Sequence, residues 1–157
     1  MNTHLNRNRA RYAAPLFAAA LAALCGCERV SDNSIEQVQL ADVAKASKER
    51  SQSYLIVDAR DAKSFNQGHI PGATRLSAAD IDFNDPDPKF KNYKAIYVYG
   101  EHPNHNNAKA LVKRLLTSKI DDVYLMDDGF LAWRTNGYPI DTVTPTPAPT
   151  PAPAPKP

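Results

Sequence analysis

The sequence predicts an α/β fold of three layers, with a mostly parallel central sheet of about five strands and helices on both faces. Short apolar runs of strand length, at 54–57 and 95–99, alternate along the chain with helical segments. The segment 108–116 has apolar residues at i, i+3, i+4, i+7 and i+8, the spacing of a helix with one buried face. Ligands of such sheets bind at the carboxyl ends of the strands, so a site is expected there.

The first half of the predicted domain is organised around a buried strand. Tyr54 to Val57 is a continuous apolar run that ends at Asp58, as buried parallel strands do. Asp61 can cap the short helix that follows. The expected elements, in order, are a strand at 35–38, a helix at 40–46, a strand at 54–57, a helix at 61–66, a turn at 68–73 and a strand at 74–76.

The second half is organised around a polar loop that joins a strand to the amphipathic helix. Such a loop points backbone N–H groups and a helix N-terminus into one crevice, where anions bind. Asn106 or Asn107 is the expected N-cap, and Phe130 and Trp133 are expected in the core. The expected elements, in order, are a loop at 80–91, a strand at 95–99, the polar loop at 100–107, the helix, a strand at 123–126 and a short helix at 130–133 that closes at Gly137.

The first 26 residues have the pattern of a secretory signal peptide. Arginines at 7, 9 and 11 precede an apolar run, 13–24, that is too short to span a bilayer comfortably. The residues at 24–27, Leu-Cys-Gly-Cys, resemble the lipobox of bacterial lipoproteins, whose cysteine receives the lipid and becomes the new N-terminus. Cys27 matches that register and Cys25 does not. The other interpretation is an ordinary secretory signal with incidental cysteines.

Lipidation at Cys27 would decide both the location and the cysteine content of the mature protein. Cys25 would leave with the signal and Cys27 would become a thioether, so no free thiol would remain. The resemblance implies passage across the inner membrane and a lipid anchor in the cell envelope. Glu28 stands where lipoproteins retained at the inner membrane carry aspartate, which favours the outer membrane, facing the periplasm. Residues 27–35 are expected to be a tether.

The charge balance argues against nucleic acid as a partner. The formal net charge of +2 becomes −1 when the three arginines of the signal segment are removed. No basic stripe remains in the sequence, and such a stripe is what a nucleic-acid-binding surface requires.

Residues 142–157 are expected to be a disordered, proline-rich tail. From 145 onward, proline alternates with threonine, alanine and lysine, a pattern that excludes helix and central strand. It predicts an extended polyproline II conformation of about 3.1 Å per residue, which reaches on the order of 40 Å. The tail is either a spacer or ligand for a proline-reading partner, or a plain solvated segment.

Three blocks of the sequence together resemble the rhodanese homology domain. The first, at 55–60, is Leu-Ile-Val-Asp-Ala-Arg, and the second, at 65–73, is Phe-Asn-Gln-Gly-His-Ile-Pro-Gly-Ala. The third, at 123–133, is Val-Tyr-Leu-Met-Asp-Asp-Gly-Phe-Leu-Ala-Trp and departs from the family pattern only at Asp128. The resemblance covers 36–141 and implies the rhodanese-like fold.

The resemblance also implies a catalytic cysteine, and this chain lacks it. In the family, a cysteine at the end of the fourth strand takes up sulfur as a persulfide, and phosphatases on the same fold need the same cysteine. The matching position here is Gly100, between Tyr99 and Glu101. Only a soft, low-pKa thiolate readily accepts and releases sulfane sulfur. The catalytic position is therefore expected to be vacant, with no cofactor to replace it.

The remaining residues of the crevice have several interpretations. His102 and His105 are weak candidates for a metal site, because zinc usually takes a third protein ligand and none is evident. Asp58 and Arg60 are expected to organise the loop by an ion pair rather than to act as acid and base. Glu101 places a negative charge where an anion would bind. The expected crevice consists of Gly100, Glu101, His102, Asn104, His105, Asn106 and Asn107 with Asp58 and Arg60.

The function predicted from the sequence is that of a catalytically inactive, rhodanese-like lipoprotein of the envelope. It would act as a binding or scaffolding module for a periplasmic protein or a small anion, and reach the membrane through its lipid. The alternative is a sulfur-handling or metal-binding protein that uses the 100–107 loop without a protein thiol.

Overall fold

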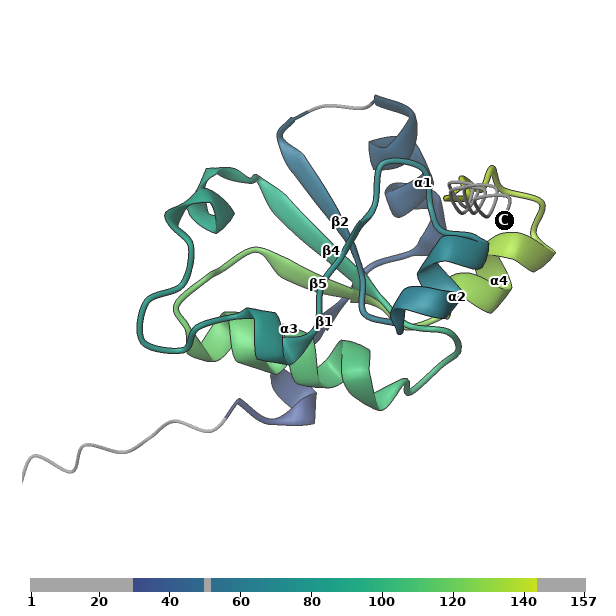
Figure 1. The fold of residues 1–157 in the computed structure, drawn as a ribbon. Coiled ribbons are helices and arrows are strands. Elements are labelled where there is room, and N and C mark those ends of the chain that lie inside the picture. Colours follow the sequence, from purple (N-terminus) through teal and green to yellow (C-terminus); the bar gives the residue numbers. More distant parts are fainter. Residues whose placement is uncertain (1–29, 50–51, 144–157) are drawn as a thin grey trace, which may run out of the picture.

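A computed structural model describes residues 30–49 and 52–143. It contains a five-stranded parallel sheet in the order β1-β5-β4-β2-β3 (Figure 1). The strands are β1 (Glu36–Gln37), β2 (Tyr54–Asp58), β3 (Thr74–Arg75), β4 (Ala95–Tyr99) and β5 (Val123–Met126). This confirms the predicted mostly parallel α/β sheet. The predicted signal segment, Cys27 and most of the predicted tail lie outside the described residues.

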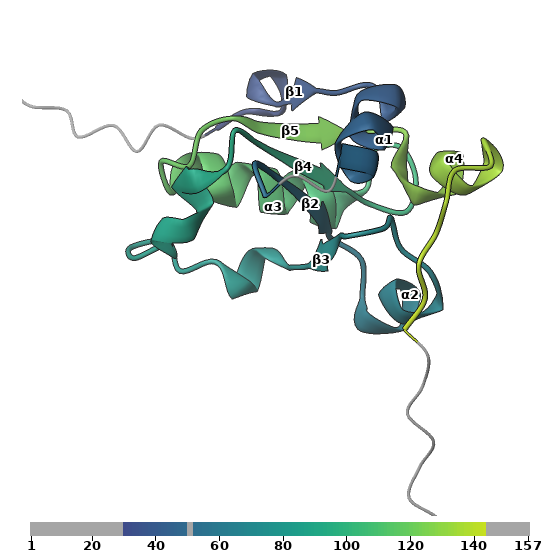
Figure 2. The same ribbon diagram turned by 90° about the horizontal axis from the view of Figure 1, so that it is seen from above.

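The helices cover both faces of the sheet, so the domain has three layers (Figures 1 and 2). They are α1 (Leu40–Glu49), α2 (Ala62–Gln67), α3 (Asn106–Thr117) and α4 (Gly129–Thr135). On one face, Leu111, Val112 and Leu115 of α3 pack against alternate strand residues such as Val57 and Val98. The opposite face packs against α1 and α4, whose contacts with the sheet include Val43, Phe130 and Trp133.

The strand sequences explain why the sheet is buried on both faces. All five residues of β4 except Tyr97 are buried, and β2 is buried over its last three residues. A parallel strand between two helical layers has no solvent face, so its sequence is a continuous apolar run instead of an alternating one. Register places Asp58 beside Tyr99 at the carboxyl ends of β2 and β4.

Two segments are more ordered than the sequence suggested. Part of the predicted tether forms a 3₁₀ turn, η1 (Asp32–Ser34), whose Asp32 pairs with Lys113 of α3. Two further 3₁₀ turns overlap the predicted loop at 80–91: η2 (Ala78–Asp80) ends at its start, and η3 (Pro88–Asn92) covers its last residues. Phe90 and Ile81 are buried there and fix the segment to the core, which proline content alone did not indicate.

The described chain ends beside α2. His69 and Asp141 form an antiparallel bridge, and the amide of Val143 donates to the Asn66 carbonyl. The indole of Trp133 donates to the Pro139 carbonyl at 2.7 Å, which closes the turn that follows α4.

Candidate functional site

The candidate site lies where β2 and β4 end and α3, α4 and α2 converge. Asp58 is the last residue of β2, and Gly100 directly follows β4. Residues that follow these two positions line a cleft of about 400 Å³, although Asp58 and Gly100 themselves do not. It is lined by Arg60, Asp61, Ser64, Gln67, Gly68, Glu101, His102, His105, Asn107, Phe130, Arg134 and Ile140.

A buried ion pair forms the floor of the site. Asp58 is fully buried, and the side chain of Arg60 is 4% exposed. The guanidinium donates from Nη2 to Asp58 Oδ2 at 2.7 Å and from Nε to Asp58 Oδ1 at 3.0 Å. Nη2 also donates to the Gly68 carbonyl, and the guanidinium carbon lies 3.9 Å from the Phe130 ring centroid. Burying two charges is costly unless each is paired and hydrogen-bonded, and here both conditions are met.

Tyr99 connects this ion pair to the turn at 68–73. Its hydroxyl donates to Asp58 Oδ2 at 2.8 Å and accepts from the Ile70 amide at 3.1 Å. Burial, and then the negative charge of Asp58, raise the pKa of Tyr99 well above its ordinary value, so the hydroxyl stays protonated. The hydrogen bonds of Asp58 and Arg60 thus connect the end of β2 to the turn and to Tyr99, and the two side chains occupy one another's charged groups.

Glu101 is the second carboxylate on Arg60. Its Oε2 accepts from Arg60 Nη1 at 2.7 Å, while its side chain remains 39% exposed at the cleft. Burial alone would lower the pKa of Arg60, but hydrogen bonds to Asp58 and Glu101 outweigh it and raise that pKa. The negative charge expected from Glu101 is thus compensated, and Arg60 has little capacity left for an anionic ligand.

His105 fills the space next to Gly100. Gly100 is buried, and a Cβ atom built on it would lie 2.5 Å from His105 Cγ and 2.7 Å from His105 Nδ1. Contacts below 3.0 Å are essentially never made by real Cβ atoms, so any side chain at position 100 requires His105 to move. His105 Nδ1 is buried without a hydrogen-bond partner in the described part of the chain. Burial, followed by the neighbouring His102, lowers the pKa of His105 and favours its neutral form.

The start of the loop is held by α4. The amide of Phe130 donates to the Gly100 carbonyl at 2.8 Å, and the amide of Leu131 donates to the Glu101 carbonyl at 2.9 Å. Gly129, at φ +75°, packs against the backbone of Glu101 and His102 so closely that an added Cβ would lie 2.7 Å from the His102 nitrogen. The loop therefore rests on Gly129, and any other residue at that position would displace the loop.

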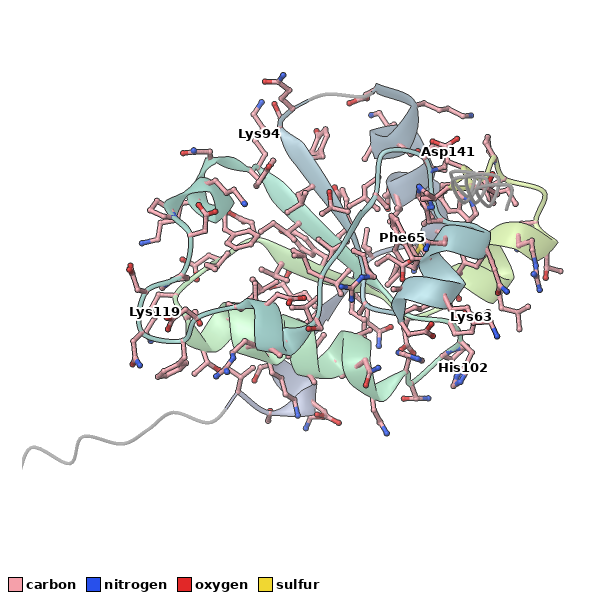
Figure 3. The ribbon with its side chains drawn as sticks, viewed as in Figure 1. Lys63, Phe65, Lys94, His102, Lys119 and Asp141 are labelled. Carbon is pink, nitrogen blue, oxygen red and sulfur yellow. The ribbon has the colours of Figure 1, made fainter. Side chains whose placement is uncertain are left out.

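The outer loop residues are placed away from the buried ion pair. His102 is exposed, and Figure 3 shows it at the outer end of the loop, near the side of α2 that carries Lys63. Its ring lies edge-on to His105 with centroids 5.5 Å apart. The backbone of Asn104 adopts φ +61°, and its N–H donates to Asp127 Oδ1. The side-chain Oδ1 of Asn104 accepts from Lys109 Nζ at 2.7 Å.

The predicted N-cap of α3 is wrong. The cap is His105, whose carbonyl accepts from the Lys109 amide, and Asn106 and Asn107 form the first helical turn. Neither asparagine caps the helix, because the loop turns into the helix one residue earlier, at the histidine packed on Gly100. Asn107 still lines the cleft, whereas Asn106 does not.

Sequence reasoning missed the wall of the cleft that α2 and α4 provide. Ser64 and Gln67 come from α2, and Arg134 comes from α4. Arg134 is exposed and makes no ion pair with the described residues. The helical spacing from Phe130 to Arg134 could have placed the arginine on the face turned to the loop, since i and i+4 share a face.

Within the described part of the chain, the two loop histidines lack the partners that a metal site needs. Over 30–49 and 52–143, no group of three or more His, Cys, Asp or Glu side chains is placed to hold a metal ion. His102 and His105 thus have no third ligand within that range.

None of the helices within residues 30–49 and 52–143 is both long enough and apolar enough to cross a bilayer.

Comparison with known proteins identifies similar chains. The family model described as Rhodanese-like domain matches residues 40–136. Thiosulfate sulfurtransferase GlpE of Pseudoalteromonas translucida is 37% identical over 79 residues, which are 50% of this chain and 71% of that protein. The GlpE of Pseudomonas savastanoi pv. phaseolicola is 33% identical over 95 residues, 60% of this chain and 84% of that protein.

Two solved structures show the same fold. A protein of unknown function and possible tyrosine phosphatase from Rhodopseudomonas palustris matches with a TM-score of 0.58 and 29% identity, covering 69% of this chain and 86% of that chain. The BH2092 protein of Bacillus halodurans matches with a TM-score of 0.61 and 21% identity, covering 69% of this chain and 77% of that chain.

Proposed function

The chain belongs to the rhodanese-like domain family, and on this premise we propose that it is a non-catalytic binding module of the cell envelope. The observation that carries the proposal is at Gly100, the position that corresponds to the family's nucleophile. A glycine has no side chain, and the space beside it is filled by His105. The site therefore differs from a family site that has merely lost its cysteine side chain, because a histidine fills the space where that side chain would begin.

The chemistry of sulfur transfer supports this proposal. A thiolate attacks the sulfane sulfur of thiosulfate, the sulfur–sulfur bond breaks, sulfite leaves, and the protein holds a persulfide. The step needs a soft electron-pair donor, which a thiolate provides and neutral imidazole or carboxylate does not. The only cysteines, Cys25 and Cys27, belong to the predicted signal and lipidation site.

A binding role is supported by the cleft itself. About 400 Å³ is within the range of ligand pockets, and its lining combines Phe130 and Ile140 with polar groups from three elements. Arg60 is held by two carboxylates, so Arg134 is the cation that faces an incoming group. This arrangement suits a small anion or the acidic side chain of a periplasmic protein.

The location follows from the N-terminal segment. Lipidation of Cys27 would anchor the chain in the envelope, with Glu28 favouring the outer membrane and a periplasmic orientation. The first described element, η1, begins at Asp32, so only a few residues would separate the lipid from the domain. Partner and ligand would then be met close to the membrane surface.

Sulfur handling is the second candidate function, because the GlpE relatives are named as thiosulfate sulfurtransferases. A thiosulfate and cyanide assay on the purified chain separates the two. We expect no more thiocyanate from the native chain than from a heat-denatured sample. Thiocyanate formation that is lost on heating would overturn the non-catalytic proposal and favour sulfur handling.

A further inference from the structure

Three tyrosines form a row on the α1 face of the sheet, away from the candidate site. They are Tyr54 of β2, Tyr97 of β4 and Tyr124 of β5, which come from three adjacent strands. The ring centroids of Tyr54 and Tyr97 are 6.0 Å apart, and those of Tyr97 and Tyr124 are 5.9 Å apart. All three are half-buried, because α1 covers this face of the sheet only in part.

The row forms the base of a groove of about 510 Å³, which we call the tyrosine groove. Its rim carries two acidic residues, Asp42 and Glu49, and two basic residues, Lys45 and Lys94, so its charge is balanced. None of the three tyrosine hydroxyls is hydrogen-bonded to another described residue. Burial, and then the neighbours Tyr54 and Asp42, raise the pKa of Tyr97, so its hydroxyl is a proton donor at every physiological pH.

A second hollow leads from the groove toward the end of the described chain. It has a volume of about 320 Å³ and is lined by Pro71, Gly72 and Asp141, together with residues of α1 and β2. It shares Tyr54 and Ala46 with the tyrosine groove, so the two hollows adjoin. Asp141 pairs with His69 and shares the lining of this hollow with Ala46 and Ser47 of α1. In Figure 3, Lys94 lies at the start of β4. Asp141 is two residues from Val143, the last described residue.

From this geometry we propose that the tyrosine groove binds the chain's own proline-rich segment, residues 144–157, as a polyproline II helix. Proline-rich segments dock in aromatic-lined grooves, because a polyproline II helix is already ordered and loses little entropy on binding. Prolines lack N–H groups and leave their carbonyls free to accept hydrogen bonds, which the tyrosine hydroxyls can donate.

The position and composition of the segment favour this occupant over a separate partner. It begins three residues after Asp141, which lines the hollow that adjoins the groove, and at about 3.1 Å per residue its 14 residues reach on the order of 40 Å. Lys156 is its only charged side chain, which suits a groove whose four charges balance. The inference is independent of whether the site at Gly100 binds a ligand.

Binding of a labelled peptide tests the proposal. The peptide has the sequence of residues 144–157, and fluorescence anisotropy measures its affinity for residues 28–157 and for the same chain ended at Val143. Both begin shortly before η1, the first described element, which starts at Asp32. A tethered segment is present at a millimolar effective concentration, so if the free peptide binds with a Kd of about 0.1 mM, the tail should weaken peptide binding about tenfold.

Two results would overturn the proposal. Absence of peptide binding to the shortened chain would mean that the groove does not accept the segment. Equal binding to the two chains would mean that the groove stands open to another protein's proline-rich segment and that the chain's own tail does not occupy it.

Matched variants of the shortened chain locate the binding. Tyr97→Phe and Tyr124→Phe each remove one hydroxyl from the groove and should weaken the peptide several-fold without affecting folding. Tyr93→Phe makes the same change outside the groove and should leave the affinity unaltered. A peptide with every proline replaced by alanine should not bind. An equal effect of all three variants, or binding of the alanine peptide, would contradict the assignment.

Discussion

Replacing Tyr99 by phenylalanine removes one buried hydroxyl and leaves the ring in place. That hydroxyl donates to Asp58 Oδ2 and accepts from the Ile70 amide, at 2.8 and 3.1 Å. Asp58 keeps its bonds to Arg60, so the main loss of stability comes from the buried Ile70 N–H, which no longer has an acceptor. A buried donor left without a partner costs about 1–3 kcal/mol, so we expect about 2 kcal/mol of destabilisation.

Urea unfolding followed by circular dichroism measures this loss. With an m-value of about 2 kcal/mol/M for a domain of this size, the midpoint should fall by about 1 M. Tyr97→Phe is the matched control, because it removes a hydroxyl two residues earlier in the same strand. No described residue is hydrogen-bonded to that hydroxyl, and its loss should change stability by less than about 0.5 kcal/mol. Equal effects of the two variants would refute the account of the buried network.

Three further predictions concern other parts of the chain. Gly129→Ala should destabilise by about 1–3 kcal/mol more than Gly137→Ala in urea unfolding. Both glycines have positive φ, but only an added Cβ at Gly129 meets other atoms within 4 Å, and equal losses would contradict the close packing. The pKa of His105 is below 6.5 in the folded chain, so the unfolded chain binds more protons, and stability should fall as pH drops through about 6.5. His105→Gln should remove this component between pH 7.5 and 5, and an unchanged pH dependence would show that His105 titrates normally. A fatty-acid label should mark the full chain in a bacterial host and be lost in Cys27→Ser but not in Cys25→Ser, whereas a label that survives Cys27→Ser would exclude this lipidation site.

Local patterns were enough to predict the main elements of the fold. The apolar runs that became β2 and β4 and the apolar face of α3 each reflect the burial of a continuous segment. Asp61 was predicted as an N-cap and accepts from the Ser64 amide at 3.0 Å, a contact between neighbours in the sequence. Such signals need no knowledge of the rest of the chain.

The geometry of the site depends on contacts that are distant in the sequence. The ion pair between Arg60 and Glu101 joins residues 41 positions apart, and no local pattern marks it. The sequence pattern predicts that Gly100 stands at the nucleophile position, but no local pattern predicts that His105 packs against Gly100. By local preference asparagine is the better N-cap of α3. The tertiary contact at His105 overrides that preference, so the helix begins after His105.

Sulfur uptake by two engineered variants tests the central claim most directly. In a chain of residues 28–157, which has no cysteine of its own, Gly100→Cys is compared with Gly100→Cys/His105→Ala after incubation with thiosulfate. Gly100→Cys/His102→Ala is the matched control, because His102 is exposed. Intact-mass measurement should show one added sulfur atom only in the variant without His105. Equal sulfur uptake by the single variant would contradict the claim that His105 occupies the place of the nucleophile.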